Sequence, residues 1–350
     1  MSKILIISAT APPTISGSGL RAYRLANNLV EKYNYQVDFC TYSDTKSDSF
    51  EVIKLLTSNS LLLKLLYVIP NFIKIFNLIR KKRYSSLHFF GFGWITILVM
   101  SANQLLFLRE PKLIFSTTMS REDDPEGILS KRNGHFFVKK VLKMDLIIAN
   151  SMKLYQDWYD FLQTNEISLG PKIVYIPSPV DINVFKPNKK ELRSNHKHRF
   201  FINYTGAIKS RKNIIFMLNA VELLKELTDK LVILKIVGKY KTKSYFNLVE
   251  DYIRDHDLKN NVVFKGFITN TFEEYSSSDV FVFASEIEGT PNACIEALAS
   301  GLPIVMRKIN GVSRELIINN VNGYEIKTPK EMAEKLMVYS NDYDLMRKHG

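Results

Sequence analysis

Short apolar runs alternate with helical stretches along most of the chain, and this alternation restricts the fold more than any other feature. In the first half it predicts a helix at residues 19–33 and strands at residues 3–10, 36–42, 85–90, 112–116, 145–149 and 172–176. Strands that alternate with helices form parallel sheets covered by those helices. The first half is therefore predicted to be an α/β domain.

The same alternation returns in the second half. It predicts strands at 200–205, 232–237, 262–265, 280–284, 303–306 and 324–326, and helices at 213–225, 245–257, 271–277, 292–300, 313–319 and 329–339. Residues 177–199, a polar stretch with three prolines and a basic cluster, separate the two halves. Because one core rarely serves more than roughly 250 to 300 residues, we expect two domains, 1–185 and 186–350.

Cysteine content and net charge narrow the class of protein. The only cysteines, Cys40 and Cys294, exclude a disulfide scaffold and a cysteine-ligated zinc site, and they favour a reducing compartment. The net charge of +13 predicts an anionic partner, such as nucleic acid, an anionic membrane surface or a phosphorylated substrate. A nucleic-acid site needs a basic face with aromatic platforms or a reader motif. Neither is evident, so we expect no nucleic-acid partner.

Two apolar segments bear on localisation. The run that follows Met1 is too short for a signal peptide and fits a buried first strand. Residues 89–108 contain no charge and are long enough to span a membrane, but two glycines, an asparagine and a glutamine interrupt them. A loop followed by a buried helix explains that segment better. We expect a cytoplasmic protein that is soluble or peripheral on the inner face of the membrane.

Residues 52–108 contain no Asp or Glu but seven basic side chains, four of which form the run at 80–83. Apolar stretches lie between the basic residues. An apolar stretch with basic flanks suits attachment to an anionic bilayer surface. A pair of core helices with a solvated basic end explains the same residues. Both interpretations stay open.

The segment at residues 284–303, ASEIEGTPNACIEALASGLP, carries the most informative motif. A strand is expected to end near Ser285 and a helix to begin near Pro291, where a proline suits the first turn. The free N–H groups around Asn292 and Ala293 would form a partly positive pocket suited to phosphate.

Two glutamates accompany this helix start. Glu288 precedes it, and Glu296 lies between one and two turns inside it. A carboxylate beside a phosphate site is costly unless it binds another group, such as sugar hydroxyls. Two ordinary solvated acids would have the same spacing, so spacing alone leaves both interpretations open.

The segment resembles the Glu-x7-Glu signature of retaining glycosyltransferases of family 4. Glu288 and Glu296 occupy the two glutamate positions of that signature. Further matches are VFKGF at 263–267, Tyr275, SDVFV at 278–282, EALASGLPIV at 296–305, Asn310-Gly311, Glu315 and Asn322-Gly323. The resemblance implies the GT-B fold, in which two Rossmann-like α/β domains face each other across a cleft. The N-terminal domain would lie on the acceptor side, and the C-terminal domain would bind the nucleotide-sugar donor.

The resemblance also implies an activity. A sugar would pass from the donor to a hydroxyl of a glycan or lipid-linked acceptor, with retention at the anomeric carbon and with neither metal nor cofactor. Assembly of bacterial-type cell-surface polysaccharide or glycolipid is the expected context. Glu288 would be the catalytic, sugar-side carboxylate, and Glu296 would hold the ribose. The expected diphosphate cradle consists of Thr290, Pro291, Asn292 and Ala293, and Gly289 just ahead of it is a further donor-binding candidate.

A second donor-binding element is expected at residues 204–213, YTGAIKSRKN. It resembles the family's Gly-Arg-x4-Lys-Gly segment, whose arginine and lysine neutralise the diphosphate. Gly206 and Lys212 match that segment. Ala207 stands in place of the arginine and Asn213 in place of the second glycine.

A developing diphosphate needs nearby positive charge, so another cation should replace the missing arginine. Lys209 and Arg211 are the candidates, and a merely solvated charge run is the alternative. The departure at Ala207 also leaves open a catalytically weak, nucleotide-sugar-binding partner subunit.

The spacing of Gly17 and Gly19 matches the fingerprint of NAD-binding Rossmann enzymes, with Asp38 as the downstream acid. However, Gly17 comes well after Thr10, and Asp38 lies inside its strand rather than at the end. An NAD-dependent enzyme is therefore the weaker alternative. The resemblance assigns Gly17, Ser18 and Gly19 to a glycine-rich loop that approaches the donor phosphates and the acceptor.

Two residues of the first half are candidates for contact with the sugar or the acceptor. Many relatives carry a histidine after the strand at 112–116, where this chain has Thr117. His88 matches another family histidine, although a histidine inside a strand is often structural.

Overall fold

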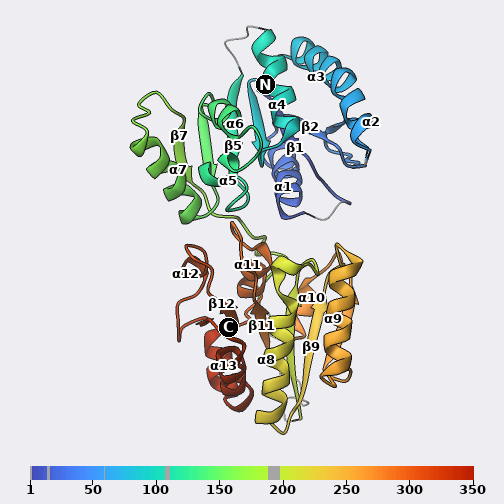
Figure 1. The fold of residues 1–350 in the computed structure, drawn as a ribbon, viewed down its shortest axis with the longest axis vertical. Helices are drawn as coiled ribbons and strands as arrows, with labels where there is room; N and C mark the ends of the chain where they lie inside the picture. Colours follow the sequence, from blue (N-terminus) through green and yellow to red (C-terminus); the bar gives the residue numbers. More distant parts are fainter. Residues whose placement is uncertain (1, 14–15, 59, 107–110, 188–197) are drawn as a thin grey trace. The chain divides into compact units, whose positions relative to one another are not determined.

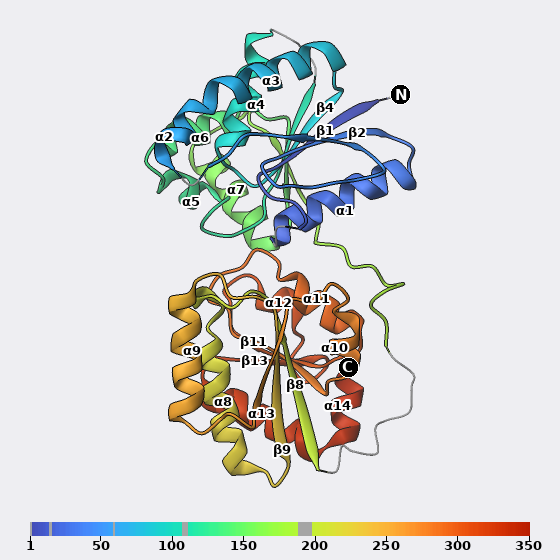
Figure 2. The ribbon, with the colours of Figure 1, turned by 90° about the vertical axis from the view of Figure 1, so that its right-hand side faces the viewer.

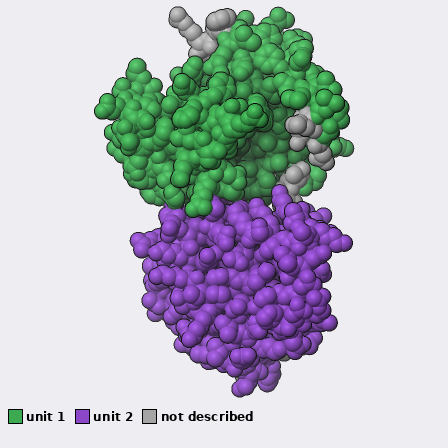
Figure 3. All heavy atoms as spheres, viewed as in Figure 1, with its two compact units in different colours: residues 1–178 green, residues 179–350 purple. Residues whose placement is uncertain are grey.

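The computed structural model describes residues 2–13, 16–58, 60–106, 111–187 and 198–350. The chain divides into two compact units, residues 1–178 and 179–350 (Figure 3). Each unit consists of a parallel sheet with helices on both faces (Figures 1 and 2). The division expected from the sequence lies seven residues further on, at residue 185.

Unit 1 (residues 1–178) contains a seven-stranded parallel sheet in the order β3-β2-β1-β4-β5-β6-β7. Its strands are β1 (Lys3–Ser8), β2 (Gln36–Thr41), β3 (Glu51–Lys54), β4 (Ser86–Phe90), β5 (Lys112–Ser116), β6 (Leu146–Ala149) and β7 (Lys172–Tyr175). Its helices are α1 (Gly17–Glu31), α2 (Leu61–Leu66), α3 (Val68–Lys82), α4 (Trp94–Leu105), α5 (Pro125–Leu129), α6 (Gly134–Val141) and α7 (Met152–Thr164). Every strand expected in this half is present, and β3 is an addition.

The core of unit 1 lies on both faces of its sheet. Successive side chains of a strand point to opposite faces. Leu5 and Ile7 of β1 therefore pack in the cluster that contains residues of α3 and α4. Ile6 packs on the other face with Ala22 and Ala26 of α1. Burial on both faces explains why β1 reads as a continuous apolar run rather than an alternating one.

Unit 2 (residues 179–350) contains a six-stranded parallel sheet in the order β10-β9-β8-β11-β12-β13. Its strands are β8 (Arg199–Thr205), β9 (Leu231–Val237), β10 (Val262–Gly266), β11 (Val280–Phe283), β12 (Ile304–Arg307) and β13 (Gly323–Ile326). Its helices are the short 3-10 helix η1 (Ser210–Lys212), α8 (Ile214–Leu227), α9 (Lys243–Asp255), α10 (Phe272–Ser276), α11 (Asn292–Ala299), α12 (Ser313–Leu316), α13 (Pro329–Asn341) and α14 (Tyr343–His349). All the expected strands and helices are present, and η1 and α14 are additions.

The uncharged residues 89–108 do not form one long helix. Strand β4 ends at Phe90, a short loop follows, and α4 occupies Trp94–Leu105 with most of its side chains buried. Within the described ranges, no helix has the length and apolar character needed to cross a membrane. Residues 107 and 108 lie outside the described residues.

Candidate functional site

The carboxyl ends of β8 and β11 lie side by side in unit 2, because these two strands pair near the middle of the sheet. Helix η1, with Arg211 and Lys212, follows β8. The loop that contains Glu288 follows β11 and leads into α11. Ligands of open α/β sheets bind at this edge. The two donor-binding elements expected from the sequence are thus brought together.

Glu288 is buried, with 5% of its surface exposed, and its carboxylate contacts two cations. Arg211 Nη1 and Lys212 Nζ each lie 2.6 Å from Glu288 Oε1. The hydroxyl of Ser285 donates to the same oxygen at 2.6 Å. Burial would raise the pKa of Glu288, but the charges of Lys212 and Arg211 hold that pKa below its ordinary value of 4.5. The carboxylate is therefore ionised at neutral pH.

Arg211 binds the loop as well as the carboxylate. Its guanidinium donates to the carbonyl of Ile287 and to the hydroxyl of Ser285, the latter at 3.3 Å. The backbone N–H of Glu286 donates to the carbonyl of Arg211 at 3.0 Å. These bonds tie the loop to η1, so the position of Glu288 depends on Arg211.

Arg211 and Lys212 share the single carboxylate of Glu288, so positive charge exceeds negative charge within this contact. Burial lowers the pKa of Lys209, and the charges of Arg211, Lys212 and Lys241 lower it further, while Glu288 opposes them. Two cations that share one carboxylate repel each other, and a second anion would relieve that repulsion. The cluster is therefore suited to an anionic ligand such as a diphosphate.

The expected diphosphate cradle lies at the start of α11. Pro291 is the residue before the first helical position, Asn292, so the expectation of a proline within the first turn is corrected by one residue. The N–H groups of Asn292 and Ala293 have no acceptor within the helix, because the first four N–H groups of an α-helix lack one. Gly289 is buried and Thr290 is half-buried in the loop ahead. In the segment after β8, Gly206 has no room for a side chain, because a Cβ there would lie 2.7 Å from the hydroxyl of Tyr204.

Glu296 lies in the second turn of α11 and is 9% exposed. The hydroxyl of Tyr275, a fully buried residue of α10, donates to Glu296 Oε2 at 3.2 Å. Burial and the charge of Glu296 raise the pKa of Tyr275, so its hydroxyl stays protonated. Sequence reasoning found Tyr275 only as a family match and missed this contact.

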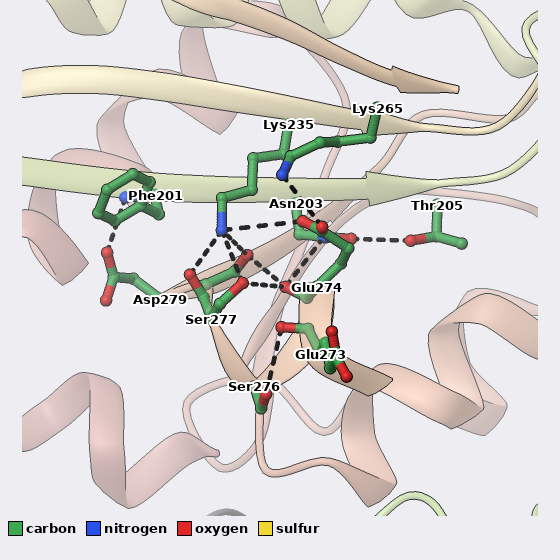
Figure 4. A network of polar contacts seen from close by, with 11 residues as sticks. Phe201, Asn203, Thr205, Lys235, Lys265, Glu273, Glu274, Ser276, Ser277 and Asp279 are labelled. Carbon is green, nitrogen blue, oxygen red and sulfur yellow. Dashed lines mark hydrogen bonds and ion pairs between the residues drawn. The ribbon is translucent and has the colours of Figure 1, made fainter. Parts of the chain in front are cut away.

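A polar network fastens α10 to the sheet (Figure 4). Lys235 of β9, a buried lysine, donates to the carbonyl and hydroxyl of Ser277 at 2.7 and 2.8 Å. Glu274 pairs with Lys265 of β10 at 3.1 Å, and its carbonyl accepts from Asn203 of β8 at 3.3 Å. Three strands thus hold the helix that carries Tyr275. No sequence pattern signals these contacts, because their members come from four separate segments.

Gly17, Ser18 and Gly19 form the first turn of α1 in unit 1 and not the expected loop. Ser16 caps this helix, since its hydroxyl accepts from the N–H of Gly19 at 2.9 Å. A Cβ at Gly19 would lie 2.3 Å from the carbonyl oxygen of Thr10. The close approach that requires this glycine is therefore to the chain's own backbone.

His88 and Thr117 are both buried in unit 1. His88 Nε2 forms a hydrogen bond with the hydroxyl of Ser116 at 2.7 Å. Burial, with a smaller effect of the Arg21 charge, lowers the pKa of His88 to about 3, so the ring is neutral at physiological pH. The hydroxyl of Thr117 donates to the carbonyl of Ile148 at 3.3 Å. Both side chains are thus bonded within the unit.

Arg21 of α1 is a half-buried cation that belongs to no sequence motif. Its guanidinium donates to the carbonyl of Thr117 at 2.7 Å and to the hydroxyl of Ser178 at 3.1 Å, and it lies over the ring of Phe90. Burial lowers the pKa of Arg21 to about 10 against the opposing charge of Asp123, so Arg21 remains protonated at neutral pH. One arginine on a helix gives no signal in the sequence.

Asp38 does not lie where an NAD-binding acid is required. It is buried within β2 and accepts from Lys82 Nζ at 3.0 Å and from the hydroxyl of Tyr84 at 2.5 Å. Lys3 Nζ lies 3.3 Å away. An acid that binds ribose needs a free carboxylate at the end of its strand, whereas Asp38 serves the packing of unit 1.

Residues 185–350 match the family model of glycosyl transferases group 1. The chain is 29% identical to the capsular polysaccharide biosynthesis glycosyltransferase CapH of Staphylococcus aureus over 230 residues, 64% of this chain and 59% of CapH. It is 28% identical over 172 residues to UDP-Gal:alpha-D-GlcNAc-diphosphoundecaprenol alpha-1,3-galactosyltransferase of Escherichia coli, covering 46% of this chain and 43% of that protein. The chain spans about half the length of the curated relatives it matches.

The solved structure of Anabaena HepE in complex with UDP-glucose resembles the whole chain. The TM-score is 0.79 at 16% identity, and the match covers 100% of this chain and 92% of HepE. At this identity the likeness shows the fold alone. The fold consists of two Rossmann-like domains of the GT-B class, and the fold predicted from the sequence is confirmed.

Proposed function

We propose that this chain is a glycosyltransferase that moves a sugar from a nucleotide-sugar donor to a hydroxyl of a glycan or lipid-linked acceptor. The match of residues 185–350 to glycosyl transferases group 1 supports the reaction class. Relatives named for capsular polysaccharide and for diphosphoundecaprenol favour a role in cell-surface polysaccharide or glycolipid assembly. Retention at the anomeric carbon rests on the Glu-x7-Glu resemblance.

The observation that carries this proposal is the contact of Glu288 with Arg211 and Lys212 at the carboxyl ends of β8 and β11. A nucleotide sugar presents a diphosphate next to a sugar, which requires cations beside a group that binds hydroxyls. The site supplies both within one hydrogen-bonded cluster. The contact of Arg211 with Glu288 supports Arg211, rather than Lys209, as the substitute for the family arginine that Ala207 replaces.

In the proposed reaction the bond between the anomeric carbon and the diphosphate oxygen breaks, and its electron pair moves to the diphosphate. Arg211 and Lys212 stabilise the added negative charge. Glu288 stabilises the positive charge that develops on the sugar ring. The acceptor oxygen forms the new bond on the same face, and its proton passes to the departing diphosphate. Glu296, held by Tyr275, binds the ribose hydroxyls.

A screen of UDP-, GDP- and ADP-sugars tests the proposal. We expect the nucleotide sugars of one base to bind, as measured by calorimetry. Hydrolysis should release the sugar from that donor slowly, and release should be faster when an acceptor is present. Absence of binding by all three classes would contradict a nucleotide-sugar site. Binding with no turnover would instead support the catalytically weak partner subunit that the departures at Ala207 and Thr117 leave open. A titration with nicotinamide dinucleotide is expected to give no signal, because the carboxylate of Asp38 is already bonded.

A lipid-linked acceptor is presented at a membrane surface. We therefore place the enzyme in the cytoplasm, peripheral on the inner face of an anionic membrane. Of the segment 52–108 expected from the sequence, β4 and most of α4 are buried, so the contact is assigned to the part that precedes β4. The opposite charges of this segment and of anionic lipids support that placement.

A further inference from the structure

The outer surface of α2 and of the first half of α3 is apolar. Six large side chains there are between 42 and 68% exposed, namely Leu62, Leu65, Leu66, Val68, Ile69 and Ile73. We call these six residues the α2–α3 apolar face; both helices lie at the rim of unit 1 (Figure 1). Apolar side chains in such density on a soluble protein mark a site for a protein partner or a membrane.

This face is distinct from the one by which α3 packs on unit 1. Asn71, Ile75 and Ile79, spaced by four residues, are the buried side of α3. Ile69 and Ile73 lie two positions from Asn71, which is about 200° around the helix. Helix α3 is therefore apolar on two opposite sides, and the rest of unit 1 covers only one of them.

Charge indicates which partner covers the other side. Lys74 is exposed next to the α2–α3 apolar face, and Arg80, Lys81 and Arg83 are exposed at the far end of α3. That end is about 18 Å from Ile69 along the helix axis. No acidic residue lies between 52 and 108. A second copy of the chain docked face to face would bring like charges together, whereas anionic phospholipids offer the opposite charge.

We propose that the α2–α3 apolar face inserts into the interfacial layer of an anionic phospholipid bilayer, with the exposed basic residues of α3 on the headgroups. The inference names the residues behind the membrane contact and is independent of the transfer reaction. Only three of the four basic residues of the run at 80–83 are available for this contact. Lys82 of that run lies 3.0 Å from Asp38 Oδ2 and 2.6 Å from Glu51 Oε2, so it stabilises unit 1.

Flotation with vesicles of phosphatidylcholine, with and without phosphatidylglycerol, tests this surface. The wild-type protein is expected to float with the phosphatidylglycerol vesicles, and less so in high salt. The double variant Leu62→Glu/Ile69→Glu should partition at least about tenfold less, because each change replaces an inserted apolar side chain by an anion. The matched control is Leu169→Glu/Ile182→Glu, which alters two apolar residues, 97 and 70% exposed, outside the face. It should float like the wild type.

Circular dichroism and thermal unfolding should be unchanged in both variants, since all four side chains are exposed. Undiminished flotation of Leu62→Glu/Ile69→Glu would overturn the proposal, as would a wild-type protein that ignores phosphatidylglycerol vesicles. A wild-type dimer in light scattering that this variant dissociates would assign the face to a second copy and equally overturn it. The assay needs neither donor nor acceptor, so its outcome is separate from that of the donor screen.

Discussion

Lys212 Nζ lies 2.6 Å from Oε1 of Glu288, although the two residues are 76 positions apart in the sequence. The cation proposed for the donor diphosphate and the carboxylate proposed for the donor sugar are therefore one buried ion pair. A diphosphate that binds Lys212 must share it with this carboxylate. We infer that the diphosphate and sugar subsites are energetically coupled through this pair.

Replacement of Glu288 by glutamine should separate transfer from donor binding. Glutamine keeps the size of the side chain and an acceptor for Ser285, but it removes the charge. We expect transfer to fall at least about hundredfold, because the charge on the sugar ring loses its stabilising group. Affinity for the nucleoside diphosphate, measured by calorimetry, should not fall, since Arg211 and Lys212 lose a competing anion. The exposed neighbour Glu286→Gln is the control, and weaker diphosphate binding by Glu288→Gln would contradict this account.

Replacement of Arg211 by alanine tests whether this residue supplies the missing cation. We expect nucleoside diphosphate to bind about tenfold more weakly or worse, because a charge-assisted hydrogen bond to phosphate is lost. Lys259→Ala alters an exposed cation ahead of β10, at the opposite edge of the sheet, and should leave binding unchanged. A larger loss for Lys209→Ala than for Arg211→Ala would transfer the assignment to Lys209.

Tyr275→Phe removes only the hydroxyl that holds Glu296. Glu296, the carboxylate proposed to bind the ribose, then loses a hydrogen bond, so we expect the KM for the donor to rise by about three- to tenfold. Tyr339→Phe is the matched control, because Tyr339 is also buried and bonded, to His349 at 2.8 Å in the same unit. Its stability loss should be similar, while its KM stays at the wild-type value. Equal KM values for the two variants would remove Tyr275 from the site.

His88 should affect how stability responds to acid. Its folded-state pKa is about 3, against an ordinary value of 6.5. As pH falls from about 6.5 towards 3, the unfolded chain binds a proton that the buried ring does not, so stability is lost over that window. In denaturant titrations, His88→Gln should lose less stability between pH 7 and pH 5 than the wild type. His135→Gln, at an exposed histidine, is the control. If the free energy of unfolding changed equally with pH in the wild type and in His88→Gln, the buried, neutral state of the His88 ring would be refuted.

The strands were predictable because burial on both faces makes each central strand a short run of apolar residues. Ile4 to Ile7 and Val280 to Phe283 are such runs. Strand β3 was missed because it is an edge strand of four residues, Glu51–Lys54, of which only Ile53 is buried. An edge strand needs little apolar character, so it leaves little signal.

The candidate site was predictable where local spacing carries the information. The positions of Glu288, Glu296 and the start of α11 could be read from a single segment. The sequence could not decide whether Lys209 or Arg211 replaces the missing arginine, because both are cations on the same short stretch. Only the packing of η1 against the loop after β11 brings Arg211 onto Glu288.

By itself, the sequence determined every strand except β3, the helices α8 to α13 and the chemical types at the carboxyl edge of the second sheet, since periodicity and motif spacing are local properties. Tertiary structure alone decided which of these groups meet. It placed Tyr275 on Glu296, engaged Lys82 with Asp38, and left Ile69 and Ile73 exposed opposite the buried side of α3. Contacts between distant segments depend on how helices pack on a sheet. A helix that is apolar on two sides does not reveal in its sequence which side the core will cover.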